Sequence, residues 1–369
     1  MKFCSECFAD VELKRLVDSI ENKGVCDVFG KESEHIYDTS KHDKLKEYFE
    51  ELLNVYTSIS AINPDIIKAK PMTLSEDLTS RGWGIFNLAC NPQSIYNIIK
   101  SVCVEKYEES PEIFDGPVVI QELYNDNYRQ THALLHDSTW DDFANSLKYQ
   151  NRFHSNYLNT SVLTKACYSS LKKYPKGSLF YRGRISDVSG FEKEKMGAPT
   201  NEQSSGGRAN PSGIRCLYLA SDVETTIHEV RAGILDYITI GTFELKEDIT
   251  IVDFSKFSNI SPFKFSINGD LVEYILNKPY FEKFNTEMGR AVRKTDSKLD
   301  YLPTQYICDF IKSLPLNFSQ FTGKIMGVEY NSTLSQNGFN LAIFEPDVFD
   351  CIDTQIHLVQ SLAYTTDKI

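Results

Sequence analysis

The sequence predicts an α+β protein with a mostly helical N-terminal domain over residues 1–150 and a mixed β-sheet domain over residues 151–369. Apolar residues recur at helical spacing in the first part, whereas the second part contains short β-branched and aromatic runs bounded by turn residues. The length agrees with two domains, because 369 residues exceed the roughly 100–200 residues of one typical domain.

The helical domain is predicted from amphipathic segments. In KHDKLKEYFEELLNVYTSISA, the side chains of Leu45, Phe49, Leu52 and Tyr56 fall on one face of a helix. Further helices are expected in SEDLTSRGWGIFN, PQSIYNIIKSVCVEKY and TWDDFANSLKYQNRF.

The second domain is predicted from its strands, which are SLFYRGRI, CLYLA, YITIGTFEL, ITIVDF, KIMGVEY, NLAIFE and QIHLVQSLAY. Helices are expected between some of them, at residues 221–232, 269–276 and 303–313. Residues 186–213 form one long irregular stretch, and loops longer than about 12–15 residues are usually functional or mobile. The mixture predicts an antiparallel or mixed sheet.

Composition narrows the class of ligand and the compartment. The chain carries 39 positive and 51 negative residues, a net charge of −12, so it lacks the broad basic field of a nucleic-acid-binding protein. No apolar run approaches the roughly 20 residues of a membrane span, and the N-terminus has no signal-peptide core. Nine mostly scattered cysteines are typical of a reducing compartment. We therefore expect a cytoplasmic protein with neither nucleic acid nor a membrane as its main partner.

The stretch GGRANPSGIRCLYLASDVETTIHEV places a carboxylate where a ligand could reach it. Val223, Ile227 and Val230 form the buried stripe of a helix, and Glu229 lies at the margin of that stripe beside small residues. In a partly dry cleft the charge of Glu229 would act through a low dielectric constant. The alternative is an exposed helical glutamate.

Arginines near this carboxylate suggest anion binding. Arg182 and Arg184 fall on the same face of a strand, and Arg208 lies in a glycine-rich loop. Guanidinium groups bind phosphate oxygens in a bidentate fork, although the strand arginines could instead pair with carboxylates. Tyr218 in the strand CLYLA either packs in the core or stacks on a planar heterocycle.

Two polar residues remain open between structural and ligand-binding roles. Ser332 follows a strand, where its hydroxyl could satisfy turn amides or hold a ribose or amide group. Gln305 lies at the start of a predicted helix, where it could act as a cap or contact a ligand.

Four segments of the second domain, taken in order, resemble the RES domain, which is named for its Arg, Glu and Ser. They are LFYRGR, GGRANPSGIRCLYLASDVETTIHEVR, DYLPTQYICDF and GVEYNST. The resemblance covers roughly residues 150 to 360. It implies a fold like that of ADP-ribosyltransferases and a role as the toxin of a bacterial toxin–antitoxin pair. It also implies consumption of NAD, by splitting the nicotinamide–ribose bond or by transferring ADP-ribose.

The resemblance implies roles for individual residues. Glu229, Arg182 and Ser332 would be catalytic, with Glu229 stabilising positive charge on the ribose as nicotinamide leaves. The residues that would contact NAD are Arg182, Arg208, Tyr218, Ser332 and Gln305. A helix-turn-helix antitoxin would be the usual partner of such a toxin.

The N-terminal domain resembles one attached to some RES proteins, called the HEPN/RES N-terminal domain, which often begins with two cysteine pairs suited to zinc. Cys4, Cys7 and Cys26 are present, but the expected fourth position is Phe29. His35 or Asp27 could complete the site.

The same domain contains RQTHALLH, whose Arg129 and His136 have a spacing reminiscent of HEPN ribonucleases. The domain is also a candidate for self-assembly, autoinhibition or triggering, for example by phage infection.

The sequence thus predicts an NAD glycohydrolase or phosphorylase acting as a toxin or antiviral defence effector. The first alternative is an ADP-ribosyltransferase that modifies a macromolecule. The second is a catalytically inactive nucleotide-binding module, and the third is a ribonuclease that acts through the N-terminal half.

Overall fold

The computed structural model describes residues 1–62, 71–267, 269–290, 298–318, 321–335 and 337–362. Its contacts divide the chain into two compact units that alternate along the sequence. The N-terminal unit comprises residues 1–138, 157–169 and 259–280. The C-terminal unit comprises residues 139–156, 170–258 and 281–369. These units are defined by contacts in space. The domain boundary that the sequence predicts between residues 150 and 151 stays a prediction.

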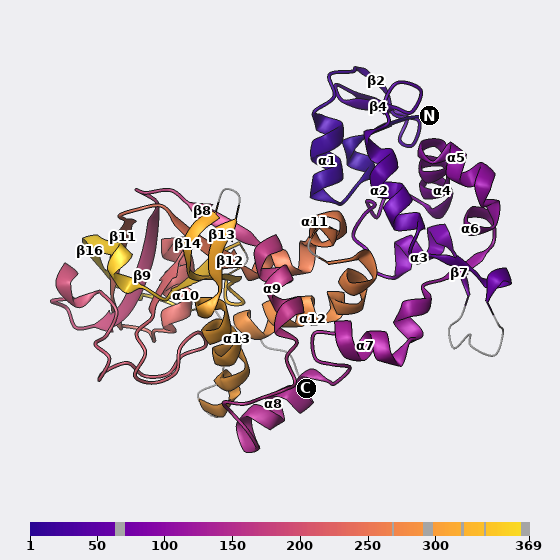
Figure 1. Cartoon of the computed structure of the whole chain (residues 1–369). Helices are drawn as coiled ribbons and strands as arrows, with labels where there is room; N and C mark the ends of the chain where they lie inside the picture. The colour runs from indigo at the N-terminus through magenta and orange to yellow at the C-terminus, as the bar shows by residue number, and fades with distance from the viewer. Residues whose placement is uncertain (63–70, 268, 291–297, 319–320, 336, 363–369) are drawn as a thin grey trace. The chain divides into compact units, whose positions relative to one another are not determined.

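The N-terminal unit is mostly helical, as Figure 1 shows in indigo and violet. Its helices are α1 (Val11–Asp18), α2 (Lys44–Leu53), α3 (Leu74–Ser80), α4 (Pro92–Val102), α5 (Val104–Glu109), α6 (Pro111–Asp115), α7 (Asp126–His132), α9 (Thr160–Ser169), α11 (Pro262–Ser266) and the first part of α12 (Leu271–Gly289). The face of α2 that the sequence predicted is confirmed, because Leu45, Phe49, Leu52 and Tyr56 are all buried.

Very short strands, which the sequence analysis did not predict, complete this unit. They are β1 (Lys2–Cys4) with β4 (Ile36–Asp38), β2 (Gly24–Val25) with β3 (Glu32–Ser33), and β7 (Pro117–Val119) between β5 (Thr57–Ser58) and β6 (Met72–Thr73). Strands of two or three residues are too short to show a period of two in the sequence.

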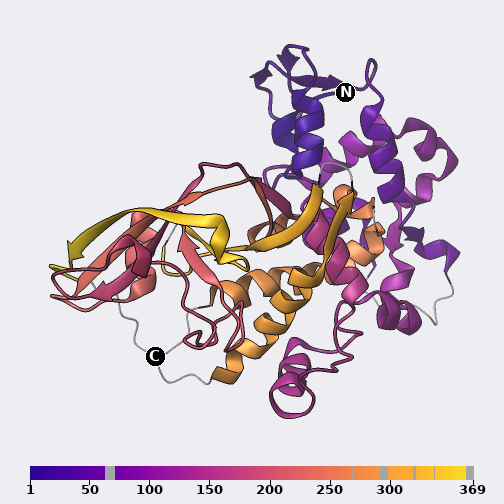
Figure 2. The same cartoon turned by 60° about the vertical axis from the view of Figure 1, so that its left-hand side comes forward.

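The C-terminal unit is built on a nine-stranded mixed sheet. Its order is β16 (Phe349–Leu358), β11 (Tyr237–Leu245), β9 (Leu179–Ser186), β10 (Leu217–Ala220), β15 (Phe339–Ile343), β14 (Phe321–Asn331), β12 (Ile249–Asp253) and β8 (Leu171–Tyr174), with β13 (Pro315–Phe318) paired to β14. Only β12 and β14 run parallel among these pairs. Figure 2 shows yellow strands from the end of the chain beside salmon strands from its middle.

The α+β prediction is confirmed, and each predicted strand run contributes to this sheet. The last predicted run, residues 355–364, corresponds to β16, which begins earlier, at Phe349, and ends at Leu358. Residues 363–364 of that run lie outside the described residues. Strands β8 and β13 were not predicted. The core on one face of the sheet is formed by Phe180, Leu217, Leu219, Phe243, Leu341 and Ile343, among others.

Helices of this unit include α8 (Trp140–Tyr149), α10 (Val223–Val230), α13 (Leu302–Ser313) and the end of α12. Helix α10 is shorter than the predicted 221–232, because the carboxylate of Asp222 caps it by accepting from the Thr225 N–H. It ends at Arg231, whose φ of 51° is left-handed. After Ser186, the last residue of β9, residues 187–213 contain only the short 3₁₀ turn η5 (Lys193–Lys195) as regular structure.

Among the described residues, no helix combines the length and apolar character that a membrane crossing requires.

Candidate active site

A cavity of about 560 Å³ opens in the C-terminal unit over strands β9 and β10 and helix α10. Its volume falls within the roughly 300–1,000 Å³ of small-molecule sites. The residues that line it are Tyr181, Arg182, Gly183, Arg184, Ile185, Tyr218, Leu219, Ala220, Thr226, Glu229, Val230, Tyr330 and Asn340. The structure therefore brings Arg182, Tyr218 and Glu229, three of the candidate residues, to one cavity.

Helix α10, which carries Glu229, packs closely on strand β9, which carries Arg182 and Arg184. A Cβ atom at Gly183 would lie 2.6 Å from Val230 Cγ2 and 2.8 Å from Thr226 Cγ2. Both distances are too short for a real contact, so only glycine allows this approach. Because Gly183 lies between Arg182 and Arg184, the helix rests on the strand between the two guanidinium-bearing residues.

The carboxylate of Glu229 is held at one oxygen. Its Oε1 atom accepts a hydrogen bond from Ser332 Oγ at 2.7 Å and another from Asn340 Nδ2 at 2.8 Å. Among the described residues, no group donates a hydrogen bond to the other oxygen, Oε2, which remains available to a ligand. Glu229 is exposed at the cavity, not enclosed in a dry core margin as the helical pattern suggested.

Ser332 has the turn contact that the sequence analysis considered and a contact with Glu229 that it did not. Its hydroxyl donates to Glu229 and also accepts from the Leu334 N–H at 3.2 Å, as serines after strands commonly do. The turn after Ser332 packs tightly against α10, because a Cβ atom at Gly338 would overlap Thr225 Oγ1. This packing delivers both donors to the carboxylate.

Arg182 projects from β9 with several N–H groups to spare. Its Nη1 atom donates to the carbonyls of Met196 at 3.0 Å and Gly197 at 2.5 Å, and none of the described residues accepts from Nε or Nη2. Burial, followed by repulsion from Arg184, lowers the pKa of Arg182 to about 10. The guanidinium is therefore still charged at neutral pH.

Arg184, on the same face, donates from Nη1 to the Lys195 carbonyl, and its guanidinium lies 4.3 Å from the centre of the Phe191 ring. Neither strand arginine forms an ion pair with a carboxylate of the described residues. The alternative that these arginines serve only as ion-pair partners is therefore not supported.

Tyr218 presents its ring to the cavity and its hydroxyl to the loop that precedes β10. The hydroxyl donates to Asn210 Oδ1 at 2.6 Å and accepts from the Ala209 N–H at 3.0 Å. Burial raises the pKa of Tyr218 well above its usual value, and burial followed by the charge of Glu229 raises the pKa of Tyr330. Both phenols are neutral at physiological pH.

Arg208 and Gln305 are not among the lining residues. The Nη1 atom of Arg208 donates to the Glu287 carbonyl at 2.6 Å, and its guanidinium lies 5.6 Å from the centre of the Tyr301 ring. Gln305 Nε2 donates to the carbonyls of Gly207 at 2.7 Å and Asn210 at 3.0 Å. In this structure both residues hold the glycine-rich loop in place.

A comparison with protein families identifies the domain that contains this site. The family model of the RES domain matches residues 184–367. The C-terminal half of the chain is a RES domain. At the level of the family, the RES domain is associated with NAD-utilising, toxin-like activity. No curated protein and no solved structure matches the chain.

The match includes Arg208, Tyr218, Glu229 and Ser332 and begins two residues after Arg182. Asn340, which the sequence analysis missed, is the second residue of strand β15 of the RES domain and faces Tyr330 of β14 in register. A polar residue within an otherwise apolar strand was the available signal.

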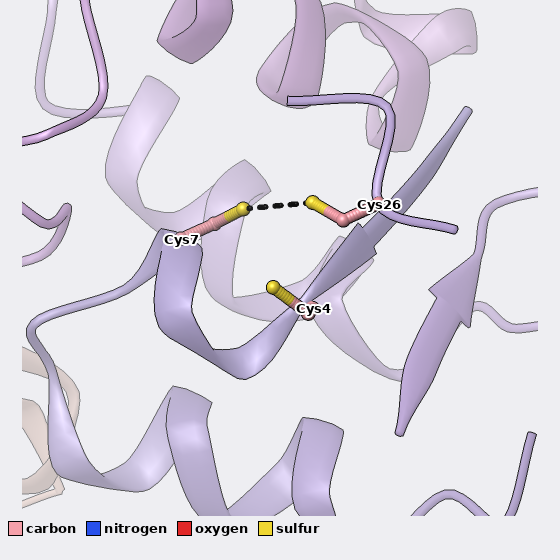
Figure 3. Close-up of side chains that lie close together, drawn as sticks. All are labelled: Cys4, Cys7 and Cys26. Atoms are coloured by element: carbon pink, nitrogen blue, oxygen red, sulfur yellow. Dashed lines mark hydrogen bonds between the residues drawn. The ribbon is translucent and has the colours of Figure 1, made fainter. Parts of the chain in front are cut away.

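Three buried thiols of the N-terminal unit lie together, as Figure 3 shows for Cys4, Cys7 and Cys26. Their sulfur atoms lie within 4.8 Å of one another, and those of Cys7 and Cys26 are 3.7 Å apart. Four sulfurs at about 2.3 Å from a tetrahedral zinc ion are roughly 3.8 Å apart, so the three thiols fit such an ion.

The two residues proposed to complete that set do not join it. His35 Nδ1 lies 2.9 Å from the Ile20 carbonyl oxygen, and the exposed Asp27 accepts from the Lys2 N–H at 2.6 Å. Neither belongs to the group of ligand atoms found among the described residues.

The pair expected for a HEPN ribonuclease has other partners. Arg129 forms an ion pair with Asp137, to which its Nε donates at 3.1 Å. His136 Nδ1 lies 2.8 Å from the Gln130 carbonyl oxygen. The ribonuclease alternative stays a prediction that no contact among these residues favours.

We expect Gly183→Ala to displace α10 from β9 and to destabilise the RES domain by about 1–3 kcal/mol, as overpacked cores do. Thermal unfolding of the full chain measures this. Gly197→Ala is the matched control, because its added Cβ would meet no atom within 4 Å. Equal melting temperatures for the two variants would contradict this account of the packing.

Proposed function

We propose that the RES domain binds NAD in the cavity over β9, β10 and α10 and splits its nicotinamide–ribose bond, with water or phosphate as acceptor. The observation that supports this most directly is the carboxylate of Glu229, fixed at Oε1 by Ser332 and Asn340 in a cavity that Arg182 also lines. Bond cleavage next to a fixed carboxylate is the chemistry that this arrangement favours.

The charges of the cavity match those of NAD. The dinucleotide is anionic at its pyrophosphate and cationic at its nicotinamide ring, and the lining residues comprise two guanidinium groups and one carboxylate. We assign the pyrophosphate to Arg182 and Arg184, since guanidinium groups bind phosphate oxygens in a fork. Arg208, a phosphate ligand by family resemblance, supports the loop in this proposal.

The reaction needs one carboxylate because of the leaving group. When the bond between the ribose C1 and the ring nitrogen breaks, its electron pair leaves with nicotinamide, which becomes neutral and needs no general acid. Positive charge then develops on the ribose, and Glu229 stabilises it electrostatically, as carboxylates do in glycoside hydrolysis. Water adds to C1 and releases a proton, which gives ADP-ribose. Phosphate as the acceptor gives the corresponding 1-phosphate.

The remaining residues position these groups. The ring of Tyr218 offers a stacking surface at the nicotinamide end, while its hydroxyl is engaged with the loop. Ser332 and Asn340 act through Glu229, because their contacts are with the carboxylate. For Ser332 this differs from the direct ribose or amide contact that the sequence suggested.

Glu229→Gln removes the negative charge while keeping the shape of the side chain. We expect NAD affinity to change little and the rate of nicotinamide release to fall by roughly 10²–10³-fold, as when one preorganised electrostatic group is lost. Glu224→Gln is the control, since Glu224 lies on the same helix with an 84% exposed side chain. If Glu229→Gln consumed NAD at the parental rate, the proposal would be refuted.

Asn340→Ala and Asn340→Asp both remove the donor to Glu229, and the second preserves the size of the side chain. We expect kcat to fall by about tenfold or more for both variants with a small change in KM, because positioning matters most in the transition state. The exposed Asn337, replaced by alanine, is the control. A rise in KM without a change in kcat would instead indicate a substrate-binding role for Asn340.

The acceptor is identified by mass spectrometry of products from NAD, with and without phosphate. We expect nicotinamide in both reactions, with ADP-ribose in the absence of phosphate. Labelled ADP-ribose on a protein or nucleic acid would favour the transferase alternative. Binding of NAD without release of nicotinamide would favour the inactive nucleotide-binding module.

A further inference from the structure

A fourth buried cysteine lies beside the three thiols of the N-terminal unit. Residues 84–90 run along residues 7–10, with an antiparallel bridge between Phe8 and Phe86. The Asn87 N–H donates to the Cys7 carbonyl at 3.0 Å, and the Cys90 N–H donates back to the Asn87 carbonyl at 2.9 Å. This backbone turn brings the Cys90 sulfur to 3.4 Å from the Cys7 carbonyl oxygen.

Cys90 is buried, as are the three clustered cysteines. The exposed fraction is 3% for Cys90 and 0% for Cys7 and Cys26. Phe29, at the position where a spaced motif would have its fourth cysteine, is partly exposed instead.

We infer that Cys90 is the fourth ligand of a structural zinc site with Cys4, Cys7 and Cys26. Zinc in structural sites takes four ligands in a tetrahedron, and thiolates are among its preferred donors. Cys90 lies outside the group of sulfurs within 4.8 Å, held by its weak S–H bond to the Cys7 carbonyl. A metal ligand must be deprotonated, so coordination removes that S–H and frees the sulfur to turn toward the other three.

Four buried thiolates make a closed site without a position for water, which distinguishes a structural from a catalytic zinc ion. The ion would join the N-terminal strand, the turn after Cys26 and the segment before α4. The chemistry at Glu229 does not depend on it.

The test uses the full chain, purified without added chelator, and three variants. We expect about one zinc ion per chain by elemental analysis. In the cobalt-substituted protein, Cys90→Ser should lose about a quarter of the thiolate-to-cobalt charge-transfer intensity, because three of four thiolates remain. Cys103→Ser is the control, since Cys103 is a fully buried cysteine of the same unit outside the cluster. Phe29→Ala should also leave the intensity unchanged.

A second measurement does not depend on the folding of a variant. In the parental protein, alkylation mapped by mass spectrometry should show Cys4, Cys7, Cys26 and Cys90 becoming reactive together when a chelator removes the zinc. Cys90 that reacts independently of the other three would overturn the inference. So would a metal-free protein, a disulfide between any two of the four, or an unchanged cobalt spectrum in Cys90→Ser.

Discussion

Helix α10 rests directly on strand β9 because Gly183, between the two arginines of that strand, has no side chain to keep it away. A second close approach involves Thr225 of the same helix, for which Gly338 leaves room. The first contact fixes the helix that carries Glu229 on the strand that carries Arg182 and Arg184, and the second brings Ser332 and Asn340 to the Oε1 atom of Glu229. The position of the Glu229 carboxylate thus depends on two glycines, Gly183 and Gly338, which lack a side chain.

Burial keeps the two tyrosines of the cavity neutral but does not discharge Arg182. Tyr218 and Tyr330 have raised pKa values and stay neutral, while Arg182 stays charged even though burial lowers its pKa to about 10. Arg182 therefore keeps its positive charge, and both phenols stay neutral, throughout the neutral pH range. Arg182 also shows how one guanidinium can serve two purposes, since Nη1 anchors the loop at Met196 and Gly197 and the other N–H groups remain for a ligand.

The sequence predicted most of the sheet but not the contacts across it. Strand β11 coincides with the predicted run, because its residues and their bounding turns follow a clear strand pattern. Helix α12 is longer than the predicted 269–276 and continues through Pro279, which local pattern alone argues against. The contact of Asn340 with Glu229 depends on the register of β14 and β15, and the anchoring of Arg208 depends on the carbonyl of Glu287. Such long-range partners leave no local signal.

The cysteines show the same limit for a metal site. Ligand spacing along the chain suggested Cys4, Cys7 and Cys26 and directed attention to Phe29, whereas coordination requires only that sulfurs meet in space. The backbone pairing of residues 84–90 with residues 7–10 makes Cys90 a neighbour of Cys7. Strands β1 to β4 have only two or three residues each, and two-stranded pairs are marginally stable by themselves in water. The few hydrogen bonds between these strands contribute little to the stability of the N-terminal segment. A metal ion bound by all four thiolates would stabilise it further, because metal binding contributes to the free energy of folding.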